Sequence, residues 1–190
     1  MSTIENFAEV SVQEQRAFAD ALIKTINSEH IFTDEVDFEI TKVEADEMSG
    51  DLAIEVTHAG DIEVTRAASW TAADEDDAYS ADGDIEYANS LTTDVEDAFK
   101  TKEATIEGYT VQLELDDADE NDTIDTEIDD ISYEDSGIGD YEYFGYYGHD
   151  SHPYVEVDGT LTVACTCYIT FYVTPNSEVS EKPAAESDEI

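Results

Sequence analysis

The chain of 190 residues has little positive charge, few prolines and almost no cysteine. No lysine or arginine occurs between Lys102 and Lys182, although the same stretch holds 21 aspartates and glutamates. The whole chain has 50 acidic and 7 basic residues, which gives a formal net charge of −43. Most carboxylates therefore have no basic residue available for an ion pair, and self-repulsion on this scale opposes compaction. A nucleic acid or phosphate ligand would be repelled by such a chain.

The scarcity of cysteine and of long apolar runs excludes further classes of protein. Cys165 and Cys167 are two residues apart in a predicted strand, so both should be buried thiols on one face and not a disulfide. Two thiols without a nearby cluster make a poor zinc site. No apolar run approaches the ~18 residues of a membrane span, and the N-terminal residues lack the features of a secretion signal. We expect a cytoplasmic protein, located in the host cell cytoplasm if a phage encodes it.

A folded N-terminal helix is predicted in spite of the charge. Hydrophobic residues make up 41% of the chain, including 11 tyrosines and 7 phenylalanines, which is more than charge-driven disorder allows. The sequence Ser11-Val12-Gln13-Glu14 has the pattern of a capping box, and Phe18, Leu22 and Ile26 follow at helical spacing. A helix over residues 11–27 should therefore lay its apolar stripe on a sheet.

Alternating apolar and polar residues predict strands after this helix. The runs cover residues 36–41, 52–56, 62–65 and 109–115, with His58–Asp61 as a turn between the second and the third. In the run Tyr154–Leu161, the dipeptide Asp158-Gly159 is the signal of a tight hairpin. The last run, Leu161–Val173, is partly apolar on both faces, which predicts a central strand that is covered on each side.

The expected fold class is therefore α+β, with an N-terminal helix packed on a mostly antiparallel, β-rich sheet with long acidic loops. Residues 1–175 should form a single domain, and a compact domain of this length is about 40 Å across. Residues 176–190 are polar and acidic, which favours a disordered tail.

Three acidic segments break the alternating pattern and form the candidate partner-binding surface. The first comprises Asp74, Glu75, Asp76, Asp77, Asp82, Asp84 and Glu86. The second, residues 116–135, contains 11 acidic residues and no base, namely Asp116, Asp117, Asp119, Glu120, Asp122, Asp125, Glu127, Asp129, Asp130, Glu134 and Asp135. The third, residues 140–150, interleaves Asp140 and Glu142 with tyrosines. These tyrosines either pack as an ordered loop or supply contacts to a partner.

No residue pattern predicts catalysis, a cofactor or a dedicated metal site. The chain lacks a phosphate-binding glycine loop, a Gly-x-Ser-x-Gly elbow and a Cys/His nucleophile pattern. With 50 carboxylates, the proximity of any two carries no information about acid–base chemistry. Asp117, Asp119 and Asn121 match a calcium loop, but Asp122 stands where glycine is needed and Ile128 where a bidentate glutamate belongs. A calcium-binding module remains an alternative.

In size, composition and blocks of acidic residues, the chain resembles the DNA-mimic proteins with which phages and mobile elements block restriction enzymes or CRISPR effectors. Its 43 net charges equal those of roughly 73 Å of duplex. The resemblance implies a non-enzymatic inhibitor that occupies the basic DNA-binding groove of a host defence nuclease or of another DNA-binding protein, without itself binding nucleic acid or a membrane. Because members of this class have unrelated folds, the resemblance implies no architecture.

The other interpretation is an acidic structural or assembly protein, or a protein adapted to high salt. A continuous negative stripe would favour mimicry, whereas a uniform scatter of carboxylates would favour salt adaptation. The sequence sets no oligomeric state, and a homodimer is compatible with it.

Overall fold

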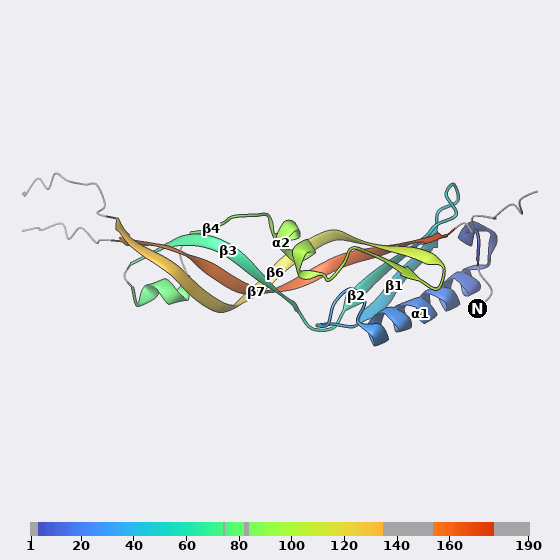
Figure 1. The fold of residues 1–190 in the computed structure, drawn as a ribbon, viewed down its shortest axis with the longest axis horizontal. Coiled ribbons are helices and arrows are strands. Elements are labelled where there is room, and N and C mark those ends of the chain that lie inside the picture. The colour runs from blue at the N-terminus through green and yellow to red at the C-terminus, as the bar shows by residue number, and fades with distance from the viewer. Residues whose placement is uncertain (1–3, 74, 82–83, 135–153, 177–190) are drawn as a thin grey trace, which may run out of the picture.

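The computed structural model describes residues 4–73, 75–81, 84–134 and 154–176. They form an elongated body built on two antiparallel strands, β6 (Tyr109–Glu134) and β7 (Tyr154–Pro175), which twist around each other along their whole length (Figure 1). At about 3.3 Å per residue, the 22 residues of β7 extend over about 73 Å. The prediction of a compact domain about 40 Å across is therefore wrong, because the length of the β6–β7 ribbon sets the long dimension of the body.

Strand β7 is the central strand of the sheet, as predicted. One edge of β7 pairs with β6, and the other pairs with β3 (Ile62–Ala72) and then with β2 (Leu52–His58). Strand β1 (Phe38–Ala45) extends β2, β4 (Ile85–Tyr87) extends β3, and β5 (Glu103–Ile106) extends β6. All pairs are antiparallel.

The body consequently has two halves with different strand orders. The proximal half, with the order β1-β2-β7-β6-β5, contains residues 109–117 of β6 and 168–175 of β7. The distal half, with the order β4-β3-β7-β6, contains residues 118–134 of β6 and 154–167 of β7. We use these two names below.

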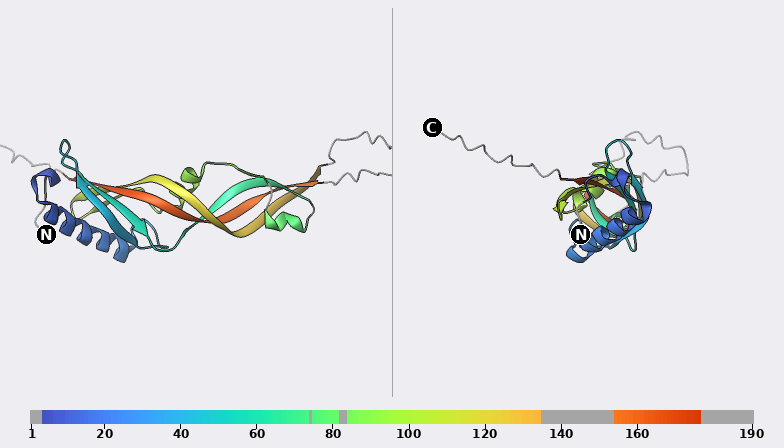
Figure 2. Two further views of the ribbon diagram at one scale, coloured as in Figure 1. Left: turned by 180° about the vertical axis from the view of Figure 1, so that it is seen from behind. Right: turned by 90° about the vertical axis from the view of Figure 1, so that its right-hand side faces the viewer.

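The predicted helix, its capping box and its packing on a sheet are confirmed. Helix α1 (Val12–Glu29) begins after Ser11, whose Oγ accepts a hydrogen bond from the Glu14 amide at 3.3 Å, while Glu14 Oε2 accepts one from the Ser11 amide at 3.0 Å. The Phe18 ring of α1 lies 4.8 Å from the ring of Tyr109 in β6. A short helix, η1 (Phe7–Glu9), adds Phe7 to the same cluster. The α+β fold class follows (Figure 2).

Two further helical segments cover the same face of the sheet in the middle of the body and in the distal half. Helix α2 (Leu91–Ala98) buries Val95 completely. The short helix η2 (Asp77–Ser80) lies over Trp70, whose Nε1 donates a hydrogen bond to the Ala78 carbonyl oxygen at 2.8 Å. The sequence analysis did not predict α2, β4 or β5, because elements this short carry little periodicity.

Helical segments cover only one face of β7, so the prediction that both faces are covered is wrong. The odd-numbered residues from Val155 to Val173 are buried, including the free thiols Cys165 and Cys167, as expected. On the other face, Tyr168 and Tyr172 are 49% and 38% exposed, whereas the smaller side chains of Ala164 and Thr170 are 5% exposed. The reason is that α1, α2 and η2 all pack on the first face. We call the uncovered side of the β3-β7-β6 sheet the open face.

From its sequence alone, the acidic segment that begins at residue 116 is expected to be a connection between strands. This prediction is wrong, because residues 116–134 are part of β6. Four register shifts against β7 each insert one unpaired residue, namely Asp116, Asn121, Ile124 and Asp129. They account for the 26 residues of β6 against the 22 of β7. Each bulge moves the inward-facing positions of β6 by one residue. The apolar and polar residues of this strand therefore do not alternate with a regular period of two. Bulges also increase the right-handed twist, which is consistent with the coiling of the ribbon.

Asp158-Gly159 is not a hairpin turn either, because it lies inside β7. Gly159 pairs with Ala68 on one side and Ile128 on the other. A Cβ atom at this position would lie 2.2 Å from the Glu127 carbonyl oxygen and 3.0 Å from the Trp70 ring. The glycine is required for the close approach of β6 and not for a turn.

The predicted turn at His58–Asp61 exists, but it joins two strands that lie end to end along one edge of β7. At this break in the edge, the Cys167 amide donates a hydrogen bond to His58 Nε2 at 3.0 Å. The other ring nitrogen, Nδ1, donates to the Gly60 carbonyl oxygen at 2.8 Å. The imidazole thus takes the place of the missing strand partner.

Candidate protein interaction surface

Six carboxylates of β6 form a row along the open face. The bulges place Asp117, Asp119, Asp122, Asp125, Glu127 and Asp130 opposite alternate residues of β7, namely Tyr168, Thr166, Ala164, Thr162, Thr160 and Asp158. Alternate residues of a strand share one face and are about 6.7 Å apart. All six acidic side chains are exposed. We call these six residues the acidic row.

Hydroxyl and amide groups, and not bases, contact the carboxylates of the open face. Tyr168 Oη donates a hydrogen bond to Asp119 Oδ2 at 3.2 Å, and this bond raises the pKa of Tyr168. Thr170 Oγ1 donates to Asp116 Oδ2 at 2.7 Å. Within the part of the chain that the structure describes, no ion pair involves a member of the acidic row. The negative charge of the row is therefore not neutralised by these residues.

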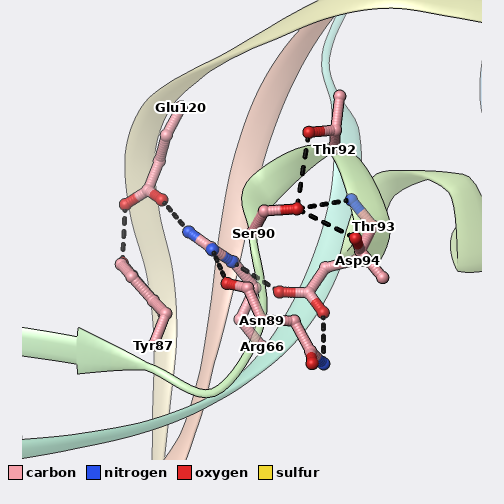
Figure 3. A network of polar contacts seen from close by, with 8 residues as sticks. All are labelled: Arg66, Tyr87, Asn89, Ser90, Thr92, Thr93, Asp94 and Glu120. Atoms are coloured by element: carbon pink, nitrogen blue, oxygen red, sulfur yellow. Dashed lines mark hydrogen bonds and ion pairs between the residues drawn. The ribbon is translucent and has the colours of Figure 1, made fainter.

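Glu120 belongs to the same acidic segment but points to the covered face, where it binds Arg66 (Figure 3). Arg66 of β3 is 4% exposed. Its Nε donates to Asp94 Oδ2 of α2, and its Nη1 donates to Glu120 Oε2, both at 2.8 Å. Its Nη2 donates to the Asn89 carbonyl oxygen at 3.0 Å. One guanidinium thus ties together β3, β6 and α2.

Tyr87 of β4 completes this network. Its ring centroid lies 3.5 Å from the guanidinium carbon of Arg66, and its hydroxyl donates to Glu120 Oε1 at 2.8 Å. Burial and the bond to Glu120 raise the pKa of Tyr87 to about 12, so the hydroxyl remains a donor at neutral pH. Sequence reasoning missed this network. The available signal was Arg66 itself, the single base between Lys42 and Lys100.

The exposed bases are distributed unevenly along the body. Within the described residues, they are Arg16, Lys24, Lys42, Lys100 and Lys102, none of which belongs to a distal strand. Most are paired with carboxylates: Arg16 with Asp20, Lys42 with Glu44 and Glu55, Lys100 with Asp34, and Lys102 with Glu96. Among the described residues of the distal strands, Arg66 is the one base, and it is buried. The distal strands therefore expose carboxylates without an exposed base.

The structure brings together only some of the predicted site residues. Glu86 of β4 lies opposite Ser69, which lies opposite Asp158, so Glu86 faces the same side as the end of the acidic row. A hollow there is lined by Ser69, Trp70, Thr71, Asp84, Glu86, Glu156 and Asp158. Glu75, Asp76 and Asp77 lie instead at η2, on the covered face. Asp129 is a bulge residue. Asp74, Asp82, Asp135, Asp140 and Glu142 lie outside the described residues, as does the side chain of Glu134.

The described residues offer little for covalent or metal chemistry. Burial raises the pKa of Cys165 to about 11 and that of Cys167 to about 12, so both thiols are protonated at neutral pH. A thiolate would be needed for nucleophilic attack or metal binding. Across residues 4–73, 75–81, 84–134 and 154–176, no group of three or more His, Cys, Asp or Glu side chains has a geometry that suits a metal ion. No helix in these ranges is long and apolar enough to cross a membrane.

Comparison of the chain with protein-family models, with curated proteins and with solved structures found no match.

Proposed function

We propose that this protein is a non-enzymatic acidic rod that binds the basic surface of a DNA-binding protein, such as a defence nuclease, and so competes with DNA. The observation that carries the proposal is the uneven distribution of charge along the body: among the described residues, exposed bases are absent from the distal strands, where five of the six members of the acidic row lie. Charge that served solubility alone would not need this segregation.

The shape of the body supports the same proposal. The net charge of the chain equals that of roughly 73 Å of duplex, and β7 by itself extends about 73 Å. The described part of the chain has 39 acidic and 6 basic residues, a net charge of −33, so the net charge per unit length of the body is of the same order as that of DNA. A groove that holds a duplex through its phosphates can accept such a rod and gain from the release of counterions.

Inhibition of DNA-binding nucleases tests the proposal. A panel of restriction and CRISPR nucleases is assayed for DNA binding and cleavage from 50 to 300 mM KCl, with and without the protein. We expect at least one enzyme to lose DNA binding at stoichiometric protein, with an affinity that falls at least tenfold over the salt series because charge contacts dominate. Poly-glutamate at equal total charge is the control, and it should inhibit more weakly. Absence of inhibition throughout the panel, or inhibition equal to that by poly-glutamate, would refute the proposal.

Adaptation of a structural protein to high salt is the second candidate, favoured by carboxylates outside the distal half. Glu14 and Glu29 of α1, Glu39 of β1 and Glu47 beyond it are all exposed. This candidate predicts unfolding as salt is withdrawn, because screening by ions is then needed to offset self-repulsion. A DNA competitor must instead be folded where DNA-binding proteins work.

Stability at low salt separates the two candidates. We expect the far-UV circular dichroism spectrum to stay constant from 2 M down to about 0.1 M KCl, since about 0.15 M is physiological. Parallel samples at low salt with sucrose control for stabilisation by solute exclusion, which needs no charge screening. Cooperative unfolding between 2 M and 0.5 M KCl would favour salt adaptation over the proposed function.

A further inference from the structure

We propose that the acidic row is the docking surface of this protein, and that the partner binds it through an extended segment with lysine or arginine at every second residue. This inference rests on the proposed function and specifies how the basic partner presents its charges. It follows from the spacing of the row, from the open face on which it lies and from the side chains beside it.

The spacing of the row matches an extended chain. The six carboxylates stand opposite alternate residues of β7, which sets a repeat of about 6.7 Å. Alternate side chains of an extended partner repeat at the same distance. Successive turns of an α-helix are only about 5.4 Å apart. Over the five intervals between the six carboxylates, basic side chains on successive helix turns would lag behind the carboxylates by about 6.5 Å, which is about one full position of the row. Successive turns of a polyproline II helix, about 9.3 Å apart, exceed the repeat at every step.

The open face leaves room for such a segment. Helices α1, α2 and η2 all pack on the opposite face of the sheet. Beside the middle of the row, β7 contributes the small side chains of Thr160, Thr162 and Ala164, so an extended backbone can come close to the carboxylates. Tyr168 stands at one end of the row, 49% exposed, and offers a ring face to a lysine or arginine.

The charges of the row are arranged for a partner and not for the fold. Within the described residues, the bases form ion pairs with other carboxylates and with no member of the row; Arg66, for example, pairs with Asp94 and Glu120. The bulges bring acidic side chains from irregularly spaced sequence positions into one line. Adjacent like charges at this spacing repel one another, and opposite charges of a partner in register remove that repulsion.

Two peptides of equal composition test the register. The probes are a fluorescent twelve-residue peptide of alternating lysine and threonine and a block peptide of six lysines followed by six threonines. Fluorescence anisotropy with the full chain at 50 and 150 mM KCl should give at least tenfold tighter binding for the alternating peptide. Equal affinities would overturn the inference, because net charge alone would then explain binding.

A matched pair of variants tests the location. In one, Asp122→Asn, Asp125→Asn, Glu127→Gln and Asp130→Asn neutralise four members of the row. In the other, Glu5→Gln, Glu29→Gln, Glu39→Gln and Glu47→Gln neutralise four exposed carboxylates elsewhere. Both lose four charges, and circular dichroism checks that both fold. We expect the row variant to bind the alternating peptide at least tenfold more weakly, and the control variant less than twofold. Equal losses would place docking elsewhere.

The outcomes for this inference and for the proposed function are distinguishable. A nuclease inhibited equally by both variants would overturn the docking surface and leave DNA competition intact. Row-dependent binding of the alternating peptide without inhibition of any nuclease would overturn DNA competition and support the docking surface.

Discussion

Replacement of Arg66 by alanine is expected to lower the free energy of unfolding by about 3 kcal/mol, the cost of removing one partner from a buried ion pair. Asp94 and Glu120 would lose their base, and their side chains are 9% and 29% exposed. The contact between Arg66 and the Tyr87 ring would be lost as well. Urea unfolding followed by circular dichroism, in parallel with the unchanged protein, measures the difference.

The triple variant Arg66→Met, Asp94→Asn and Glu120→Gln is the matched control. It removes all three charges together, so no buried charge is left unpaired, and we expect it to be more stable than Arg66→Ala. If instead the two variants are equally destabilised, the lost hydrogen bonds of the Arg66 guanidinium, and not an unpaired buried charge, account for the cost. A loss below about 1 kcal/mol for Arg66→Ala would contradict a buried ion-pair network.

Replacement of Gly159 by alanine is expected to cost about 3 kcal/mol, at the upper end of the range for an overpacked interior. The added Cβ would meet the Glu127 carbonyl oxygen at 2.2 Å, and this oxygen belongs to the backbone of β6 and cannot rotate away. Strands β6 and β7 must then move apart at Gly159, which lies opposite Ile128, between Glu127 and Asp130 of the acidic row. Thermal and urea unfolding both report the change.

Gly60→Ala is the control, because it adds the same methyl group where nothing lies within 4 Å. Its φ of 84° is unfavourable for alanine, which should cost about 1 kcal/mol. Equal costs for the two variants would mean that the close approach of β6 to Gly159 does not constrain this protein.

The sequence predicted those elements whose signals are local. The capping box at Ser11 and the helical spacing of Phe18, Leu22 and Ile26 depend only on neighbouring residues, and α1 forms as they indicate. The alternation in β7 likewise identified a strand at the centre of the sheet, although it also predicted cover on both of its faces. Both signals survive because helix and strand periods are properties of the chain itself.

The acidic segment of β6 was misinterpreted for the opposite reason. Inward positions there fall at Leu113, Leu115, Ala118, Glu120 and Thr123, so the spacing changes from two to three at each bulge. The bulges exist only by reference to β7, and no local pattern announces them. Gly159 shows the same limit, since Asp-Gly favours a turn locally while the neighbouring backbone of β6 requires glycine within a strand.

For the candidate surface, the sequence by itself determined the amount and sign of the charge, and that 11 of the 50 acidic residues lie between residues 116 and 135 without a base. Only the tertiary structure decided which carboxylates share a face. Pairing with β7 turned Glu120 inward to Arg66 and brought Asp117, Asp119, Asp122, Asp125, Glu127 and Asp130 into one row. The physical reason is that composition fixes the number of charges, whereas the face of each side chain in a bulged strand depends on its register with a partner that lies far away in the chain.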